Sequence, residues 1–445
     1  MNGAHREPAL LIEPVPRSLV LGIFAFALLV RLGYCFVAIP VLGLSAGPGN
    51  EAFYYTDGFV NLAQNLLEYG KLAFTADAAP TTYRAPAHPL FLAALSRIVG
   101  DIGAAQLVLN SISSALAVAL SYLCATMIIG RGSRLAWIAG IVLPISIHYC
   151  ASGFADTFYS FTVCLYAYTL LRLVAEPRPG AAVLHGVTYA FTSLTKAVLL
   201  PFPVVFALYL WVRNRKTTGL WLVAMLIGLA LIAPWSYRNY RVSGQFIPVT
   251  HGFGYGVLMG NHMAAKGPDI PASTQYSISA IVRDLSKASG RSWSFDELRT
   301  GGYFEPSIEV DRMSLGIAVE QFRDHPSSLV RKVLVNSYRF WCFSDSARKS
   351  LILAFMHFPL LLLAGFGLWK RWSRARAMIE PLVLLAVAFM GTYAIIIVHS
   401  VRYALPLLML AAPLAGQGLA DVGASVWGSW IRSAGPERPS DVTPF

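Results

Sequence analysis

The sequence contains little charge and lacks the signatures of several enzyme classes. Only 13% of its 445 residues are charged, against about 25% in typical soluble domains. Its five cysteines are scattered singly, without a CxxC pair, which argues against a disulfide framework and a zinc site. No HExxH pattern, serine nucleophile elbow or nucleotide-binding glycine loop is present. The composition excludes an ordinary soluble domain, and the motifs do not support a zinc, serine or nucleotide-dependent enzyme.

Apolar residues are abundant instead, because they make up 56% of the chain and gather in long runs. A helix needs roughly 20 mostly apolar residues to span a bilayer. The sequence therefore predicts an all-α polytopic membrane protein with about ten transmembrane helices, in a range of nine to twelve. The predicted spans are residues 18–40, 102–128, 135–150, 155–174, 181–196, 198–212, 219–236, 351–369, 378–399 and 403–423.

The basic residues lie in short clusters between these runs, although the formal net charge is +12. This distribution favours membrane topology over a nucleic-acid surface. When the N-terminus is placed in the cytoplasm, every short basic turn falls on the cytoplasmic side, as the positive-inside rule requires. No small-residue cleavage site follows the first apolar run, so we interpret this run as an uncleaved signal anchor.

This orientation divides the chain into five parts. They are a cytoplasmic N-terminus (1–17), a transmembrane core (18–236) that includes a first periplasmic loop (43–101), a periplasmic loop with amphipathic helices (237–350), C-terminal transmembrane helices (351–423) and a cytoplasmic tail (424–445). Residues 89–99 are apolar but too short to span, which predicts an interfacial helix. Residues 327–341 combine helically spaced apolar residues with Arg331, Lys332 and Arg339, which predicts a basic helix on the membrane surface.

Three acidic residues stand close to the predicted membrane. Glu51 and Asp57 lie in the first loop among aromatic residues, and Asp156 lies where a predicted span begins. An ionisable group at membrane depth is a functional hypothesis by default. Such a carboxylate could act as a general base, or the three could share a divalent cation. The alternatives are solvated loop acids for Glu51 and Asp57 and a helix N-cap for Asp156.

Three cations are predicted on the same outer side as these acids. Arg84 lies in a proline-containing segment, where its guanidinium could grip a phosphate through two hydrogen bonds. Lys196 lies near the end of an apolar helix, and Arg402 lies between the last two spans. For Lys196, contact with a lipid headgroup is the alternative interpretation.

The segment 234–244 places two arginines, Arg238 and Arg241, outside the membrane, against the positive-inside trend. A specific anionic partner would explain them. The aromatic residues of this segment, Trp235, Tyr237 and Tyr240, are typical of side chains that anchor a helix at the membrane interface.

Taken together, these residues resemble the GT-C superfamily of membrane glycosyltransferases, in the branch of the protein O-mannosyltransferases and the lipid A aminoarabinose transferase (families 39 and 83). The matching elements, in chain order, are Asp57 with Leu62-Ala-Gln-Asn-Leu66, Tyr83-Arg-Ala-Pro-Ala-His-Pro-Leu90, Asp156, Lys196, Pro234-Trp-Ser-Tyr-Arg-Asn-Tyr-Arg-Val-Ser-Gly244 and Arg402-Tyr-Ala-Leu-Pro406. Two departures matter. Lys196 stands where the family has arginine, and Asp57 is not followed by the usual second acid or aromatic residue, so Glu51 remains its rival.

The resemblance implies a GT-C fold and an enzyme of the bacterial inner membrane whose active site faces the periplasm. Such an enzyme transfers a sugar, with inversion, from an undecaprenyl-phosphate-type donor to lipopolysaccharide or lipid A, a cell-wall glycan or a protein. A transporter or flippase of lipid-linked sugars and an O-antigen ligase or polymerase are the alternatives. No cofactor is implied, and a divalent cation stays open.

The resemblance also assigns roles to particular residues. Asp57, Asp156 and Glu51 are the catalytic candidates, and Arg84, Lys196, Arg402 and Arg238 are the candidates for binding the donor phosphate. The candidates for a substrate-binding loop are Tyr55, Tyr83, His88, Asn239, Tyr240, Asn261 and Tyr403.

Overall fold

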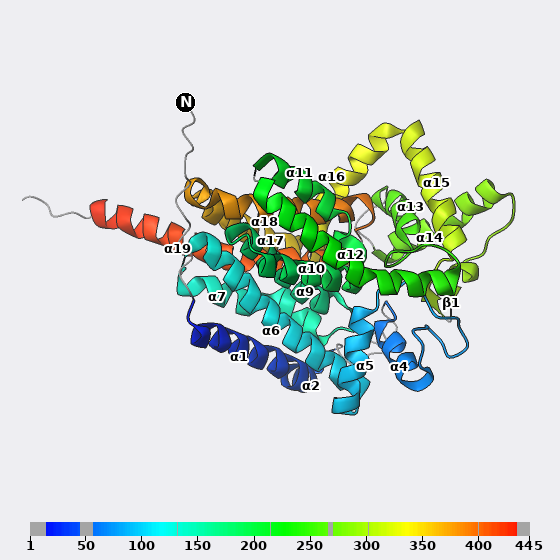
Figure 1. Ribbon diagram of the computed structural model, residues 1–445, viewed down its shortest axis with the longest axis horizontal. Coiled ribbons are helices and arrows are strands. Elements are labelled where there is room, and N and C mark those ends of the chain that lie inside the picture. The colour runs from blue at the N-terminus through cyan, green and yellow to red at the C-terminus, as the bar shows by residue number, and fades with distance from the viewer. Residues whose placement is uncertain are drawn as a thin grey trace, which may run out of the picture.

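The computed structural model describes residues 15–44, 57–130, 132–213, 215–265, 270–300, 302–398 and 400–433. Within them, eight helical segments are long and apolar enough to cross a membrane, and they run side by side in a bundle (Figure 1). They comprise α1 (Arg17–Gly33) with η1 (Tyr34–Ala38) and α2 (Ile39–Leu42), α6 (Ile102–Ile129), α7 (Arg134–Ile141) with α8 (Pro144–His148) and η2 (Tyr149–Ala151), α9 (Asp156–Ala175), α12 (Arg215–Ser243), α17 (Ala347–Trp369), α18 (Trp372–Ile395), and η5 (Val401–Ala404) with α19 (Leu405–Ser433). The chain is a multi-pass membrane protein.

The two remaining predicted spans are also helical but shorter. They form α10 (Pro179–Thr195) and, after η3 (Ala197–Leu199), α11 (Phe202–Arg213). All ten predicted spans are thus helices, and the prediction of an all-α membrane protein is confirmed.

The two long segments between spans fold at the same end of the bundle, which we call the loop end (Figure 1). The first segment forms α4 (Phe59–Tyr69) and α5 (Ala87–Val99). The second forms α13 (Phe253–Ala264), α14 (Ile270–Ser289), η4 (Asp296–Leu298), the antiparallel strands β1 (Arg299–Thr300) and β2 (Tyr303–Phe304), α15 (Ile308–Asp324) and α16 (Pro326–Cys342). A separate small hydrophobic core joins α13, α14 and α15. The second segment therefore has a core of its own.

A buried arginine supports a break in one membrane helix. The helical backbone is interrupted between α7 and α8, where Pro144 has no N–H to offer the carbonyl of Gly140. Arg31 of α1 is fully buried and donates to the carbonyls of Gly140 and Ile141, at 3.5 and 3.2 Å. Its other hydrogen bonds go to the hydroxyls of Ser114 and Ser146 and to its own helix. Arg31 thus satisfies carbonyls that would otherwise be unpaired in the bilayer.

Helix α16 matches the predicted helix at 327–341, but its orientation corrects the prediction of a basic surface helix. Its exposed face is apolar, because Val330, Leu334 and Tyr338 are 61%, 66% and 59% exposed. Lys332 and Arg339 instead point inward and are almost fully buried. Both donate to backbone carbonyls of α13, Lys332 to Val257 at 2.8 Å and Arg339 to Met263 at 2.9 Å. Lys332 and Arg339 therefore fasten α16 to α13, whereas Arg331 is exposed.

Lys332 begins a chain of hydrogen bonds through the loop end. Its Nζ donates to Asn261 Oδ1 at 2.8 Å, and the Asn261 amide donates to Gln321 at 2.9 Å. Gln321 in turn donates to Asp284, which also contacts His262 at 2.9 Å. Burial lowers the pKa of Lys332 to about 7. The network thus links α13, α14, α15 and α16 around a lysine that loses its proton easily.

Substitution of Arg31 by methionine should lower the midpoint of thermal unfolding by roughly 5 °C or more, because each buried acceptor left unpaired costs about 1–3 kcal/mol. Arg17→Met, at an exposed position of the same helix, is the matched control. Fluorescence-detected gel filtration of heated samples measures both. Equal midpoints for the two variants would show that Arg31 does not support the helix break.

Raising the pH from 7 to 8 should stabilise the loop end through Lys332. The unfolded lysine has a pKa of about 10.4 and keeps its proton in this window, whereas the folded one loses it. The unfolded state therefore binds more protons, and stability rises with pH by about 1 kcal/mol. Limited proteolysis between α13 and α16 should slow about fivefold in the wild type relative to Lys332→Met. The control Lys287→Met, at an exposed position of α14, should behave as the wild type, and an equal pH response in all three proteins would contradict the assignment.

Candidate active site

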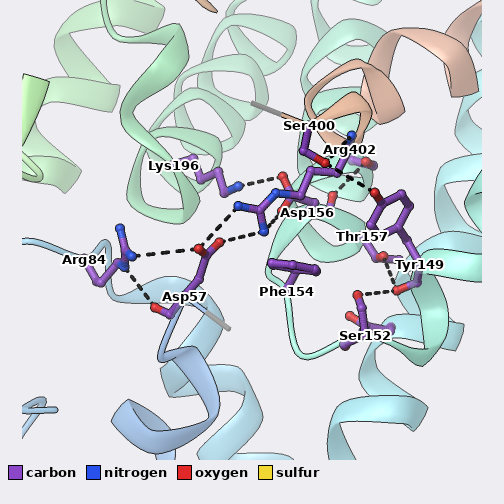
Figure 2. A network of polar contacts seen from close by, with 12 residues as sticks. Asp57, Arg84, Tyr149, Ser152, Phe154, Asp156, Thr157, Lys196, Ser400 and Arg402 are labelled. Atoms are coloured by element: carbon purple, nitrogen blue, oxygen red, sulfur yellow. Dashed lines mark hydrogen bonds and ion pairs between the residues drawn. The ribbon is translucent and has the colours of Figure 1, made fainter. Parts of the chain in front are cut away.

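Asp57 stands on a tight turn directly before α4. Its φ is 57°, and that of Gly58 is 70°, so two successive residues adopt the left-handed conformation. A Cβ on Gly58 would lie 2.4 Å from the ring of Phe74 and 3.0 Å from that of Tyr303, so this position requires glycine. The turn directs the Asp57 side chain toward the middle of the site (Figure 2).

Arg402 lies between the two acids, as Figure 2 shows. Its Nη1 is 2.8 Å from Asp57 Oδ2, and its Nη2 donates to Asp57 Oδ1 at 3.3 Å. The same Nη1 is 3.5 Å from Asp156 Oδ2. The guanidinium lies 3.7 Å above the centre of the Phe154 ring, and its side chain is only 4% exposed. One buried cation therefore joins both carboxylates.

Asp156 is the first residue of α9, and its side chain is 2% exposed. Lys196, between α10 and η3, donates from Nζ to Asp156 Oδ1 at 2.6 Å. The N-cap residue of α9 is Ala155, and Asp156 already belongs to the helix, so the N-cap interpretation of Asp156 is wrong. Lys196 Nζ also lies 5.7 and 5.8 Å from the ring centres of Tyr159 and Tyr403. Lys196 and Asp156 thus form a buried ion pair.

The backbone that leads to Asp156 is held by two amide side chains of α6. Asn110 donates to the carbonyls of Cys150 and Ser152 at 3.2 and 2.8 Å. Gln106 lies within 3.4 Å of the carbonyls of Ser152 and Phe154. Gln106, Asn110 and Phe154 were not predicted from the sequence as site residues. The two amides, four residues apart inside an apolar run, were the available signal.

Arg84 approaches Asp57 from the other side. Its Nε donates to the Asp57 carbonyl at 3.1 Å, and its Nη2 is 4.0 Å from Asp57 Oδ1. The guanidinium also lies 4.5 Å from the ring centre of Tyr83. At 22% exposed, Arg84 is more accessible than Arg402. Arg84 therefore forms the open edge of the site.

The charges of this cluster do not cancel. Two carboxylates, Asp57 and Asp156, face three cations, Arg84, Lys196 and Arg402, which leaves one positive charge in excess. Burial raises the pKa of Asp57, but Arg402, then Arg84 and Lys196, lower it, so that this pKa lies well below its usual value. Asp57 is therefore ionised at neutral pH, and the site as a whole attracts an anion.

Three of the candidate substrate residues border the cluster. Tyr83 lies against Arg84 and against His251, whose ring centre is 5.3 Å away. His88 is fully buried between the rings of Phe59 and Phe158, at 5.3 and 5.6 Å. Burial and then Lys196 lower the pKa of His88 to about 3, so this histidine is neutral.

Tyr403 follows Arg402 in the chain and stacks on Tyr393 at 4.5 Å. Its ring also lies near Lys196. Tyr403 therefore forms part of the aromatic wall behind the two cations.

Other candidates lie apart from the cluster. Arg238 donates to the carbonyl of Thr81 at 2.6 Å and lies over the ring of Trp235, and Asn239 donates to the carbonyls of Ile247 and Val249. Arg238 thus holds the backbone of the segment that carries Arg84, and Asn239 holds the backbone that follows α12. Tyr240 is 52% exposed, and Asn261 belongs to the Lys332 network. Glu51 and Tyr55 lie outside the described residues.

Asp57 and Asp156 do not form a divalent-cation site between them, and Glu51, the third acid of that hypothesis, lies outside the described residues. Among the described residues, no group of three or more His, Cys, Asp or Glu side chains could hold a metal ion. Arg402 lies between Asp57 and Asp156 and supplies the positive charge there. The residues present therefore do not fit a metal shared by these two carboxylates.

Comparison with known proteins gives one family match. Residues 83–237 match the model of the dolichyl-phosphate-mannose-protein mannosyltransferase family. The matched region includes Arg84, Asp156 and Lys196 but ends before Arg402. No curated protein matches the chain in sequence.

The fold is shared with a solved structure. The oligosaccharyltransferase of Archaeoglobus fulgidus in its apo form is 16% identical with a TM-score of 0.55, and the match covers 96% of this chain and 53% of that one. The present chain thus spans about half the length of that enzyme. ArnT from Cupriavidus metallidurans bound to undecaprenyl phosphate is 14% identical with a TM-score of 0.41, and the match covers 96% of this chain and 82% of that one.

At such identities, likeness to the oligosaccharyltransferase shows a common fold, and the mannosyltransferase family model is matched within that fold. The predicted resemblance is therefore confirmed for the fold and for the region that the family model matches. The chain has the GT-C fold of membrane glycosyltransferases, and over residues 83–237 it matches the mannosyltransferase family model.

Proposed function

We propose that the protein transfers a sugar from a polyprenyl-phosphate donor to an acceptor hydroxyl at the loop end of the bundle. The observation that carries the proposal is the convergence of two acids and three cations from separate segments, with one positive charge in excess. A lipid-borne phosphate is an anion that such a cluster can bind. The proposal places the protein in a bacterial inner membrane with the site facing the periplasm.

In the proposed reaction, Asp57 is the general base. The acceptor oxygen attacks the anomeric carbon, the bond from that carbon to the phosphate oxygen breaks, and polyprenyl phosphate leaves with the electron pair. The hydroxyl proton passes to Asp57. A single displacement of this kind inverts the anomeric carbon. Asp57 is suited to the role because it is ionised and, at 23% exposed, is the more accessible of the two acids.

The cations stabilise the phosphate as it leaves. Charge that develops on a leaving group is best stabilised by donors already in place. Arg84 and Arg402 offer guanidinium groups, and Lys196 offers an ammonium group. Asp156, which is 2% exposed and bound to Lys196, acts as a positioning residue for these cations. The acceptor is a glycolipid such as lipid A, a cell-wall glycan or a protein hydroxyl.

Asp57→Asn should reduce transfer at least 100-fold, because general base catalysis typically contributes 10²–10⁴-fold. Purified protein with labelled polyprenyl-phosphate sugars and a panel of acceptors measures the activity, and gel filtration checks folding. The control Asp77→Asn, at an exposed position of the same loop, should leave activity near wild type. Full activity in Asp57→Asn together with loss in Glu51→Gln would assign the base to Glu51.

Arg84→Ala should raise the KM for the donor roughly tenfold while the KM for the acceptor stays unchanged, because a charge-assisted hydrogen bond to the donor phosphate is lost. Arg84→Lys should recover part of the loss. The control Arg97→Ala, at an exposed position of α5, should match the wild type. A donor KM that does not respond to Arg84→Ala would exclude phosphate binding by this residue.

A further inference from the structure

We infer that Arg402 is a gate on Asp57, holding this carboxylate in the donor-free protein and releasing it when a lipid phosphate takes the guanidinium. The inference rests on the proposed function and adds an order of events to it. The donor binds first, and the base becomes available to the acceptor afterwards.

The first observation is the way in which Arg402 holds Asp57. Both carboxylate oxygens face the guanidinium, at 2.8 and 3.3 Å. A general base must present a free lone pair to the hydroxyl within about 2.6–3.2 Å. It must also keep enough negative charge to attract the proton. The two-point contact occupies one lone pair on each Asp57 oxygen and offsets the negative charge, so Asp57 is a weaker base while the contact persists.

The second observation is an unsatisfied oxygen on the other acid. Asp156 Oδ2 is buried and has no hydrogen-bond partner among the described residues. Arg402 Nη1 lies 3.5 Å away, slightly beyond a good hydrogen bond. Lys196 engages only Oδ1 of this carboxylate. A buried acceptor left unpaired is costly, so Asp156 offers Arg402 a second position in which that cost is removed.

The third observation is the surface on which Arg402 lies. Its guanidinium stacks 3.7 Å above the centre of the Phe154 ring. Stacking on a ring face leaves the in-plane N–H groups free to change partners. A small shift across Phe154 therefore moves the guanidinium from Asp57 toward Asp156 without loss of its aromatic contact.

Binding of a phosphate supplies the free energy for this shift of Arg402. Arginine binds phosphate oxygens through two parallel hydrogen bonds, and this geometry rivals its grip on a carboxylate. Arg84 and Lys196 border the same space and add their charges. In the donor complex Arg402 is shared between phosphate and Asp156, and Asp57 is freed. A ligand shifts an equilibrium between two states only if it binds one of them more tightly. Here the phosphate binds more tightly to the state in which Arg402 has left Asp57, because only that state offers it the guanidinium.

The test measures binding of undecaprenyl phosphate to purified protein in lipid nanodiscs by scintillation proximity. If phosphate must take Arg402 from Asp57, the cost of breaking that pair masks much of the contribution of Arg402. Arg402→Ala should therefore weaken binding by less than about threefold in the wild-type background. In the Asp57→Asn background it should weaken binding by about tenfold or more.

The gate is overturned if the two factors by which Arg402→Ala weakens binding come in the opposite order. If Arg402 stays on Asp57, its removal exposes a negative charge to the phosphate, so Arg402→Ala weakens binding at least as much in the wild-type as in the Asp57→Asn background. In a control background with Asp77→Asn, a substitution in the same loop, Arg402→Ala should weaken binding by the same factor as in the wild-type background. If the wild type does not bind undecaprenyl phosphate, the donor class of the proposed function fails together with the gate. If the wild type binds undecaprenyl phosphate but the two factors come in the opposite order, only the gate is overturned.

A structure of the protein with undecaprenyl phosphate provides a second test that does not require any variant to fold. The gate predicts that the Arg402 guanidinium contacts the phosphate and Asp156 Oδ2, with both Asp57 oxygens released. A complex in which Arg84 and Lys196 hold the phosphate while Arg402 keeps its two-point contact with Asp57 would overturn it.

Discussion

The burial of one guanidinium constrains the whole loop end. Arg402 is 4% exposed, and a charge in such surroundings costs several kcal/mol unless it is paired and hydrogen-bonded. Its partners come from far along the chain, Asp57 before α4 and Asp156 at the start of α9. The turn at Gly58, the loop before α9 and the short helix η5 must therefore all converge on one place. The remaining polar residues of the region act mainly to bring them there.

Those supporting residues share one physical task, which is to satisfy backbone groups where the chain leaves a helix. Arg31 donates to carbonyls at the break before α8, and Asn110 donates to the loop that precedes Asp156. Arg238 donates to Thr81 in the segment that leads to Arg84. In a bilayer, irregular backbone is tolerated only where protein groups pair with it. The polar side chains inside apolar helices thus determine where the charged cluster can form.

Much of the fold could be predicted from the sequence, because spanning a bilayer requires long apolar runs and these are visible in any one chain. The charged members Asp57, Arg84, Asp156, Lys196 and Arg402 were also found, since ionisable groups beside apolar runs are rare. The sequence did not separate them from Arg238 and Asn261, which pair with the protein itself. That distinction depends on which groups meet in three dimensions. The orientation of α16 was mistaken for a similar reason, because its apolar face points outward and its basic residues face α13.

The electrostatics of the cluster bear on when the proton moves in the proposed reaction. Arg84 and Lys196, which stay beside Asp57 when Arg402 moves, also lower the pKa of this carboxylate, which makes it a weak base toward an ordinary hydroxyl. The hydroxyl becomes far more acidic once its oxygen begins to bond to an anomeric carbon with oxocarbenium character. Cations that first stabilise the departing phosphate therefore also prepare the acceptor to give up its proton. In such a site the excess positive charge and the weak base are compatible, because breaking the bond to the phosphate precedes proton transfer.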